Sequence, residues 1–88
     1  MANHKSALKR IRQTAKRTKR NQHIRTGMRT QVKHFLQAVE AGDAALADER
    51  FPTAERAIRR AASSGIIPRQ RADRHVSRLA KRLNALNR

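Results

Sequence analysis

Basic side chains form the part of this sequence best suited to bind a ligand. Residues 9–25, KRIRQTAKRTKRNQHIR, contain eight Lys or Arg residues and no acid. A guanidinium group can hold a phosphate through two parallel hydrogen bonds, and an ammonium group attracts it as a point charge. The chemistry that this segment predicts is the binding of a polyanion through its phosphates.

A row of basic residues is often only a solvated helix face, but here it opposes folding. On a helix, like charges four residues apart repel by about 0.2–0.5 kcal/mol per pair. The pairs are Lys5 with Lys9, Arg12 with Lys16, Lys16 with Arg20, Arg25 with Arg29, and Arg29 with Lys33. Because a phosphate backbone would remove this repulsion, we expect residues 1 to about 22 to be frayed or disordered when free and helical when bound.

A second basic surface is predicted near the C-terminus. With Val76 and Leu79 directed toward a core, the helical period places a group of basic residues on the opposite face. This group is Arg74, Arg78 and Lys81, flanked by Arg71, His75 and Arg82. For this surface, and for Arg56, Arg59 and Arg60, a solvated face and a phosphate-binding face both fit the pattern.

The charge of the whole chain names the kind of partner. Its 88 residues include 22 Lys or Arg and six acids, and the net charge of +16 attracts nucleic acid first and an anionic membrane second. With only two Phe and no Trp or Tyr, stacking of bases is not the expected mode. We therefore expect folded, helical nucleic acid read by its shape. Hydrogen bonds to riboses and base edges can come from Asn3, Gln13, Thr14, Thr18 and Asn21.

No set of residues predicts catalysis, a cofactor or a metal. The four His lack metal-ligand spacing and the chain has no Cys. Asp48 and Glu49 diverge by about 100° on a helix, so they cannot share a substrate. Ser63 and Ser64 precede Gly65 without the pattern of an activated nucleophile. We predict that the protein is not an enzyme.

Three helices are expected to position the basic residues. Residues 6–41 contain no Pro and one Gly, which predicts one long helix with Ser6 or Asn3 as its N-cap. Apolar residues recur at steps of three and four over residues 44–61 and 72–86, which predicts two shorter amphipathic helices.

Turn residues predict where the shorter helices begin and end. Asp43 is the expected N-cap of the second helix, Gly65 its C-terminal cap, and Pro68 the opening of the third helix. Pro52 would cost about 3 kcal/mol inside a helix. We therefore expect a kink or a fresh helical start near Phe51, so that this segment is two pieces sharing one face.

The first helix is too long for its partners to cover. It would span roughly 54 Å, and partners of about 20 residues cover only about 30 Å. The continuous apolar face begins at Ile24. We predict one all-α domain over residues 1–88, a three-helix antiparallel bundle at 24–88 with the highly basic N-terminal part of the overlong first helix, residues 1–23, as an overhang. Its few large apolar residues make it marginal alone, so a stabilising partner is expected.

Two other classes of protein are less consistent with the pattern. A basic-region dimer needs three or four heptads, whereas the apolar stripe of the first helix spans fewer than two. A membrane-surface helix needs bulky apolar residues opposite its charges, and residues 9–23 lack them. No apolar run follows the basic N-terminus, so a secretory signal is not expected, and the basic character extends to Arg88, which argues against a mitochondrial presequence.

Several stretches together resemble one known family over nearly the full chain, without a gap. They are MANHKSALKRIRQ at 1–13, RN at 20–21, MRT at 28–30, VEAGD at 39–43 and GIIPRQRADRHVSRL at 65–79. Their order and spacing are similar to those of family twenty (S20) among the proteins of the bacterial small ribosomal subunit. The resemblance implies a three-helix bundle that binds small-subunit (16S) ribosomal RNA directly and early in assembly, with its long helix inserted among RNA helices.

The resemblance also implies particular contacts. By position, the RNA-facing residues would be Ala2, Asn3, Lys5, Ser6, Lys9, Arg10, Asn21, Arg25, Arg29, Lys33, Arg74, His75, Ser77 and Arg78. The charge pattern adds Arg12, Lys16, Arg17, Arg20 and Lys81. The family implies a cytoplasmic ribosomal protein, a monomer within the ribosome with few or no contacts to other ribosomal proteins and none to a membrane.

The sequence departs from the family at four positions. Pro68 and Gln70 replace the residues usual in the loop before the third helix. Asp73 places an acid beside the basic face, where we expect it to serve the N-terminal turn of the third helix. Gly27 in the middle of the first helix costs about 1 kcal/mol relative to Ala and is expected to mark a bend.

Overall fold

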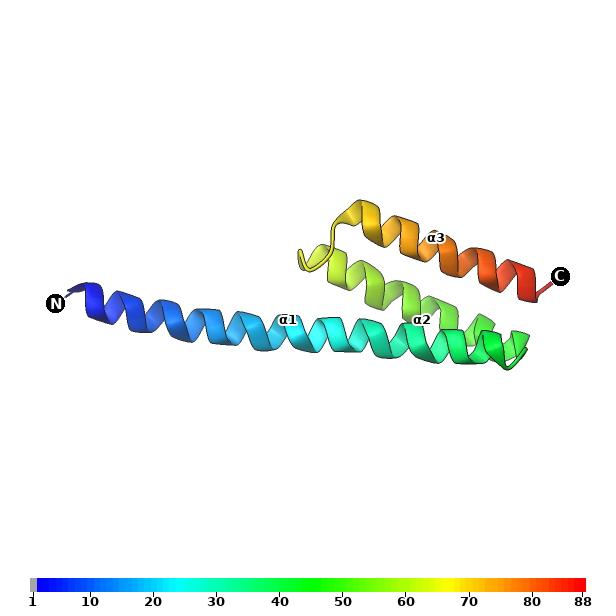
Figure 1. The fold of residues 1–88 in the computed structure, drawn as a ribbon, viewed down its shortest axis with the longest axis horizontal. Coiled ribbons are helices and arrows are strands. Elements are labelled where there is room, and N and C mark those ends of the chain that lie inside the picture. The colour runs from blue at the N-terminus through cyan, green and yellow to red at the C-terminus, as the bar shows by residue number, and fades with distance from the viewer. Residues whose placement is uncertain (1) are drawn as a thin grey trace.

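Residues 2–88 form three helices joined by two short connections. The computed structural model describes residues 2–88, with side chains from residue 4 onward. The helices are α1 (Ala2–Glu40), α2 (Ala44–Ser63) and α3 (Arg69–Leu86), and residues 2–88 contain no strand. Successive helices run in opposite directions (Figure 1). The predicted all-α, three-helix fold with an overlong first helix is confirmed.

The second helix lies between the other two. α2 packs along both α1 and α3, whereas α1 and α3 have few contacts with each other. The three helices therefore form a flat, elongated array rather than a closed triangle, with extents of 67 × 22 × 14 Å (Figure 1). Only α2 is covered on two sides by protein, which leaves most of α1 available for other contacts.

Small and aromatic side chains build the core between these helices. Phe35 of α1 and Ile58 of α2 are fully buried, and the Phe35 ring packs at 59° to that of Phe51 with 5.7 Å between centroids. Ala47 and Ala54 on α2 are also fully buried. Alanine lets backbones approach closely, so this core depends on short side chains as well as on large ones.

Glycines end the first two helices in the same way. Gly42 and Gly65 have φ of 72° and 76°, a conformation that favours residues without a Cβ. After α1, the N–H of Asp43 donates to the carbonyl of Ala38; after α2, the N–H of Ile66 donates to that of Ala61. Both are Schellman-type ends. The predicted cap at Gly65 is therefore confirmed.

The residue after the first of these turns also begins the next helix. The Asp43 carboxylate accepts a hydrogen bond of 3.0 Å from the N–H of Leu46, as predicted for an N-cap. Pro68 is the N-cap of α3 rather than its first helical residue. Connections this short require the neighbouring helices to be antiparallel.

Two predictions about helix boundaries are wrong. Neither Asn3 nor Ser6 is an N-cap, because α1 already begins at Ala2 and both residues lie inside it. The expected fresh helical start near Phe51 is also wrong, because α2 is one helix with Pro52 inside it. The Pro52 side chain is exposed while Phe51 and Ala54 pack inward on either side of it, so tertiary packing holds the helix across the proline.

Protein covers only the C-terminal part of α1. Every residue from 4 to 20 is exposed, and Ile24, at 7% exposure, is the first buried residue. Leu8 and Ile11 are the large apolar side chains that residues 4–88 leave exposed. We call residues 4–23 of α1 the overhang; it extends alone to the left in Figure 1.

Candidate nucleic-acid interface

The basic residues of the overhang project into solvent. The predicted RNA-binding residues found there are Lys5, Ser6, Lys9, Arg10, Arg12, Lys16, Arg17 and Arg20, all exposed, and Asn21, which is half-buried. Among residues 4–88, both ion pairs are made by Arg59 of α2, so no acid neutralises the overhang through an ion pair. The side chains of Ala2 and Asn3 lie outside those that the structure describes.

The helical period gathers the overhang charges on one side. At about 100° per residue, the basic residues from Lys5 to Arg20 fall within roughly one half of the α1 circumference. Lys9, Lys16 and Arg20 form its central line. Ile11 projects from the other half, and the Thr18 hydroxyl donates to the carbonyl of Thr14 at 2.9 Å. The overhang is therefore suited to follow one polyanion along its length.

Another group of predicted residues lies on the opposite side of α1. Arg29 and Lys33 are exposed, and together with His75 of α3 they line a groove of about 450 Å³ between α1 and α3. The floor of this groove is apolar, with Met28 and Leu36 among its lining residues. The fold thus brings together predicted residues that are more than 40 positions apart in the sequence. Arg25 is exposed and lines no cavity with them.

Four α3 residues line a second concavity beside this groove. Arg71, Arg74, His75 and Arg78 surround a space of about 380 Å³. Three guanidinium groups around one space make a site for phosphate or another anion. Ser77 and Lys81 are exposed but do not line it, so the predicted α3 set is only partly brought together.

The sequence placed Arg71 beside the second basic surface but not among the predicted RNA-binding residues. Its spacing of three and four residues from Arg74 and His75, on the same side of α3, was the available signal. His75 is half-buried, and burial lowers its pKa first, with further lowering by the charges of Arg78 and Arg71. His75 is therefore neutral at pH 7 and can accept or donate a hydrogen bond.

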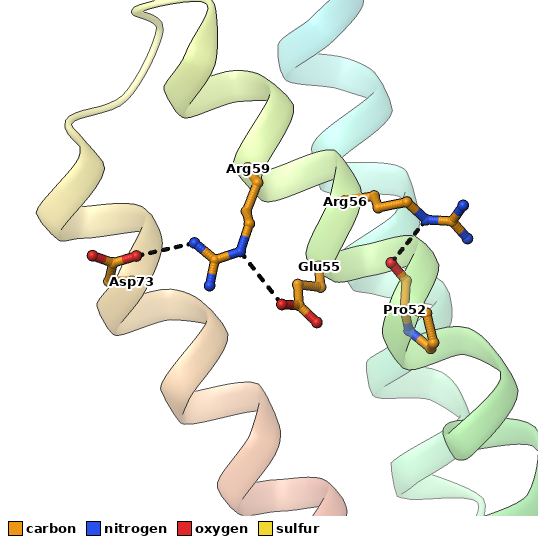
Figure 2. Close-up of polar contacts among 5 residues, drawn as sticks. All are labelled: Pro52, Glu55, Arg56, Arg59 and Asp73. Carbon is orange, nitrogen blue, oxygen red and sulfur yellow. Dashed lines mark hydrogen bonds and ion pairs between the residues drawn. The ribbon is translucent and has the colours of Figure 1, made fainter.

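Arg59 and Asp73 connect α2 to α3 instead of contributing to a basic surface. The Arg59 guanidinium donates to Asp73 at 3.1 Å and to Glu55 at 3.3 Å, as Figure 2 shows. These hydrogen bonds, that to Asp73 first, raise the pKa of Arg59. The expected role of Asp73 at the N-terminal turn of α3 is thus corrected: its carboxylate bridges two helices.

The same view separates Arg56 from Arg59. The Arg56 Nε donates to the carbonyl of Pro52 at 3.3 Å, and its guanidinium extends to the side of α2 away from Asp73 (Figure 2). Arg56 and Arg60 line a concavity with α1, whereas Arg59 does not. The three arginines that the sequence could not distinguish therefore fall into two groups.

Neither a metal site nor a membrane span lies within the described part of the chain. Residues 4–88 contain no group of three or more His, Cys, Asp or Glu side chains placed to hold a metal ion. Within the described residues, no helix combines the length and the apolar character needed to cross a membrane.

The fold and the charge distribution define a small, all-helical, strongly basic protein with a single-helix overhang. Sequence comparison then gives the family: the chain belongs to the ribosomal protein S20 family, whose sequence model matches residues 2–84. This is a family of ribosomal structural proteins and not of enzymes.

Curated relatives match the chain over almost its full length. The small ribosomal subunit protein bS20 of Geotalea uraniireducens is 54% identical over 86 residues, covering 98% of this chain and 99% of the relative. That of Geotalea daltonii is 54% identical over 87 residues, covering 99% and 100%. The protein of the same name from Nitratiruptor sp. is 48% identical over 87 residues, covering 99% and 97%.

Proposed function

We propose that this chain is a structural protein of the bacterial small ribosomal subunit, in the cytoplasm, that binds 16S ribosomal RNA directly and stabilises the RNA fold during assembly. The ribosomal role is supported by the family and by the names of the relatives. Direct RNA contact is supported by one observation above all. The overhang presents its basic half with no protein cover, on a chain of net charge +16.

The two basic surfaces favour insertion between RNA segments. The basic half of the overhang and the groove with Arg29, Lys33 and His75 lie on opposite sides of α1. A single straight RNA helix could not contact both surfaces. We therefore propose that α1 lies between two RNA segments and neutralises phosphates on each.

The roles proposed for the two parts of the chain follow from which α1 residues are buried by protein. Residues 24–88 form the bundle and carry the groove surface, and residues 1–23 form the basic overhang, which binds RNA without protein cover. The Ile24 side chain marks the boundary, because burial of α1 starts there. The net charge repels a second copy, which supports a monomer whose partner is RNA and which has few or no contacts with other ribosomal proteins.

Charge reversal tests direct RNA binding. Replacing Arg17 and Arg20 together by Glu removes two exposed cations that have no ion pair, so the fold should be unchanged. Affinity for purified small-subunit RNA should fall. The negative slope of log affinity against log salt should become shallower, its magnitude falling by about 0.7–0.9 for each lost phosphate contact. Filter binding over a salt series measures both quantities.

A matched pair provides the control. Arg82 lies near the end of α3 and Arg88 follows that helix. Both are exposed, and the C-terminal end of α3 lies opposite the overhang (Figure 1). Their replacement by Glu makes the same change in net charge but should weaken binding much less. Equal losses for the two pairs would mean that only total charge matters. Preference of the unmodified protein for anionic vesicles over RNA would refute the proposal outright.

A further inference from the structure

Gly27 occupies a position on α1 for which the protein itself gives no reason. It is exposed and lies in the middle of a helix, where Gly is less stable than Ala by about 1 kcal/mol. A Cβ built at Gly27 would meet no atom within 4 Å. Its φ is negative, so the backbone does not require Gly. α1 also continues through it as one helix. The α1 ribbon shows no sharp bend along its length in Figure 1.

The position of Gly27 relates it to the overhang. Gly27 follows Lys9 by 18 residues, which is about five helical turns, so the two residues lie on the same line of α1. Lys16, Arg20 and His23 lie close to this line between them. The central line of the basic half thus leads to the one α1 residue without a side chain.

A concavity with further positive charge lies at that point. Gly27 and His23 of α1 line a space of about 270 Å³ together with Arg56 and Arg60 of α2. Both arginines are exposed and neither forms an ion pair. The Nε of Arg56 is held by the carbonyl of Pro52, which directs its two terminal nitrogens outward (Figure 2). A phosphate can be bound through those two nitrogens.

We propose that one RNA backbone runs along the basic half of the overhang and passes directly over Gly27, where Arg56 and Arg60 bind its phosphates. Glycine permits an RNA sugar or phosphate to approach the helix more closely than a side chain would. This inference rests on the proposed function and extends it. It adds Gly27, His23, Arg56 and Arg60 to the interface, and it assigns the missing side chain to the RNA rather than to a bend.

A bulky side chain at Gly27 tests the close approach. The probe is purified small-subunit RNA, bound by the full chain in a filter assay. Gly27→Leu should weaken binding by roughly tenfold or more. The leucine side chain would push the RNA backbone away from α1 and so break its charged hydrogen bonds to Arg56 and Arg60. The matched control is Thr26→Leu, on the adjacent exposed residue, which projects about 100° away and should change affinity by less than about twofold.

Stability must be measured alongside affinity. Leu is a better helix former than Gly, so the midpoint of thermal unfolding of Gly27→Leu should equal or exceed that of the unmodified protein. A variant that is more stable and yet binds RNA less well cannot owe its loss to unfolding. If the unfolding midpoint of Gly27→Leu is lower, the test uses Gly27→Ala instead, which adds one methyl group in open space. Its matched control is then Thr26→Ala.

A separate variant tests the arginines without altering α1. Arg60→Gln should lower the salt slope by about 0.7–0.9, the value for one phosphate contact. An unchanged slope, together with a Gly27→Leu affinity equal to that of the unmodified protein, would overturn the inference. So would equal losses for Gly27→Leu and Thr26→Leu. The proposed function fails differently, because then the unmodified protein would itself show no salt-dependent RNA binding.

Discussion

Replacing Lys16 by Glu should change helix content and RNA affinity in opposite directions. Lys16 is exposed in the overhang, with Arg12 and Arg20 one helical turn before and after it. The substitution converts two repulsive pairs into two attractive ones. At about 0.2–0.5 kcal/mol for each pair in each state, the helix gains roughly 0.8–2 kcal/mol.

The change should be visible because residues 4–20 of the overhang are all exposed and gain little stability from packing. The 39, 20 and 18 residues of α1, α2 and α3 make 77 helical residues out of 88. If residues 2–22 are unfolded when free, 56 remain helical. Circular dichroism at 222 nm should therefore show a signal for the free protein that is about a quarter lower than the full value and rises on addition of RNA. Lys16→Glu should recover part of that signal without RNA.

RNA binding should show the opposite effect. Lys16→Glu removes one cation from the central line of the basic half and places an anion there, so affinity falls and the salt slope decreases by about 0.7–0.9. Lys16→Gln, which removes the repulsion without adding attraction, should lie between Lys16→Glu and the unmodified protein in both assays. If the free protein already shows the signal of 77 helical residues and Lys16→Glu leaves it unchanged, coupled folding and binding of the overhang is refuted.

Other predictions concern the bundle. Phe35→Ala should lower the free energy of unfolding by about 3–5 kcal/mol, because the ring is fully buried against Phe51; urea denaturation measures this, and a loss below about 1 kcal/mol would contradict the described core. The pKa of His75 is lowered in the fold, so the unfolded chain binds more protons as the pH falls through the ordinary value of 6.5 and stability decreases on acidification. Melting His75→Gln between pH 7.5 and 5 should show a smaller acid-induced loss; an equal loss would place the titrating group elsewhere.

The helices themselves could be predicted from the sequence because local rules determine them. Apolar steps of three and four give the buried faces of α2 and α3. Asp43 and Gly65 lie next to those faces, and their residue types are favoured at the N-cap and at the C-terminal end of a helix. The length mismatch between α1 and its partners follows from residue counts alone. The family resemblance also depends only on the sequence, and it is confirmed by the family model and by the curated relatives.

Contacts between helices could not be predicted in the same way. Which helix lies in the middle depends on how closely the helix backbones approach. The buried Ala47 and Ala54 side chains of α2 are small and permit a close approach of its neighbours. The continuation of α2 through Pro52 could not be predicted, because its local cost of about 3 kcal/mol is offset by tertiary packing, with Ala54 buried and Phe51 half-buried against the core. The bridge from Arg59 to Asp73 joins residues 14 apart, which no helical period relates.

The predicted interface shows the same limit. Overhang positions could be named from charge, since one helix fixes their mutual directions. The grouping of Arg29 and Lys33 with His75 required the position of α3 relative to α1. The grouping of Arg56 and Arg60 with Gly27 required the position of α2, because each group includes residues from two helices.

Most of the acids of the chain lie at one end of the long axis of the molecule. Glu40, Asp43, Asp48 and Glu49 cluster around the turn between α1 and α2, at the opposite end from the overhang (Figure 1). Over an extent of 67 Å, this separation gives the molecule a large electric dipole in addition to its net charge. In the field of the proposed RNA partner, such a dipole would turn the overhang forward before contact. Most encounters would then begin in the productive orientation, and the association rate would depend strongly on salt.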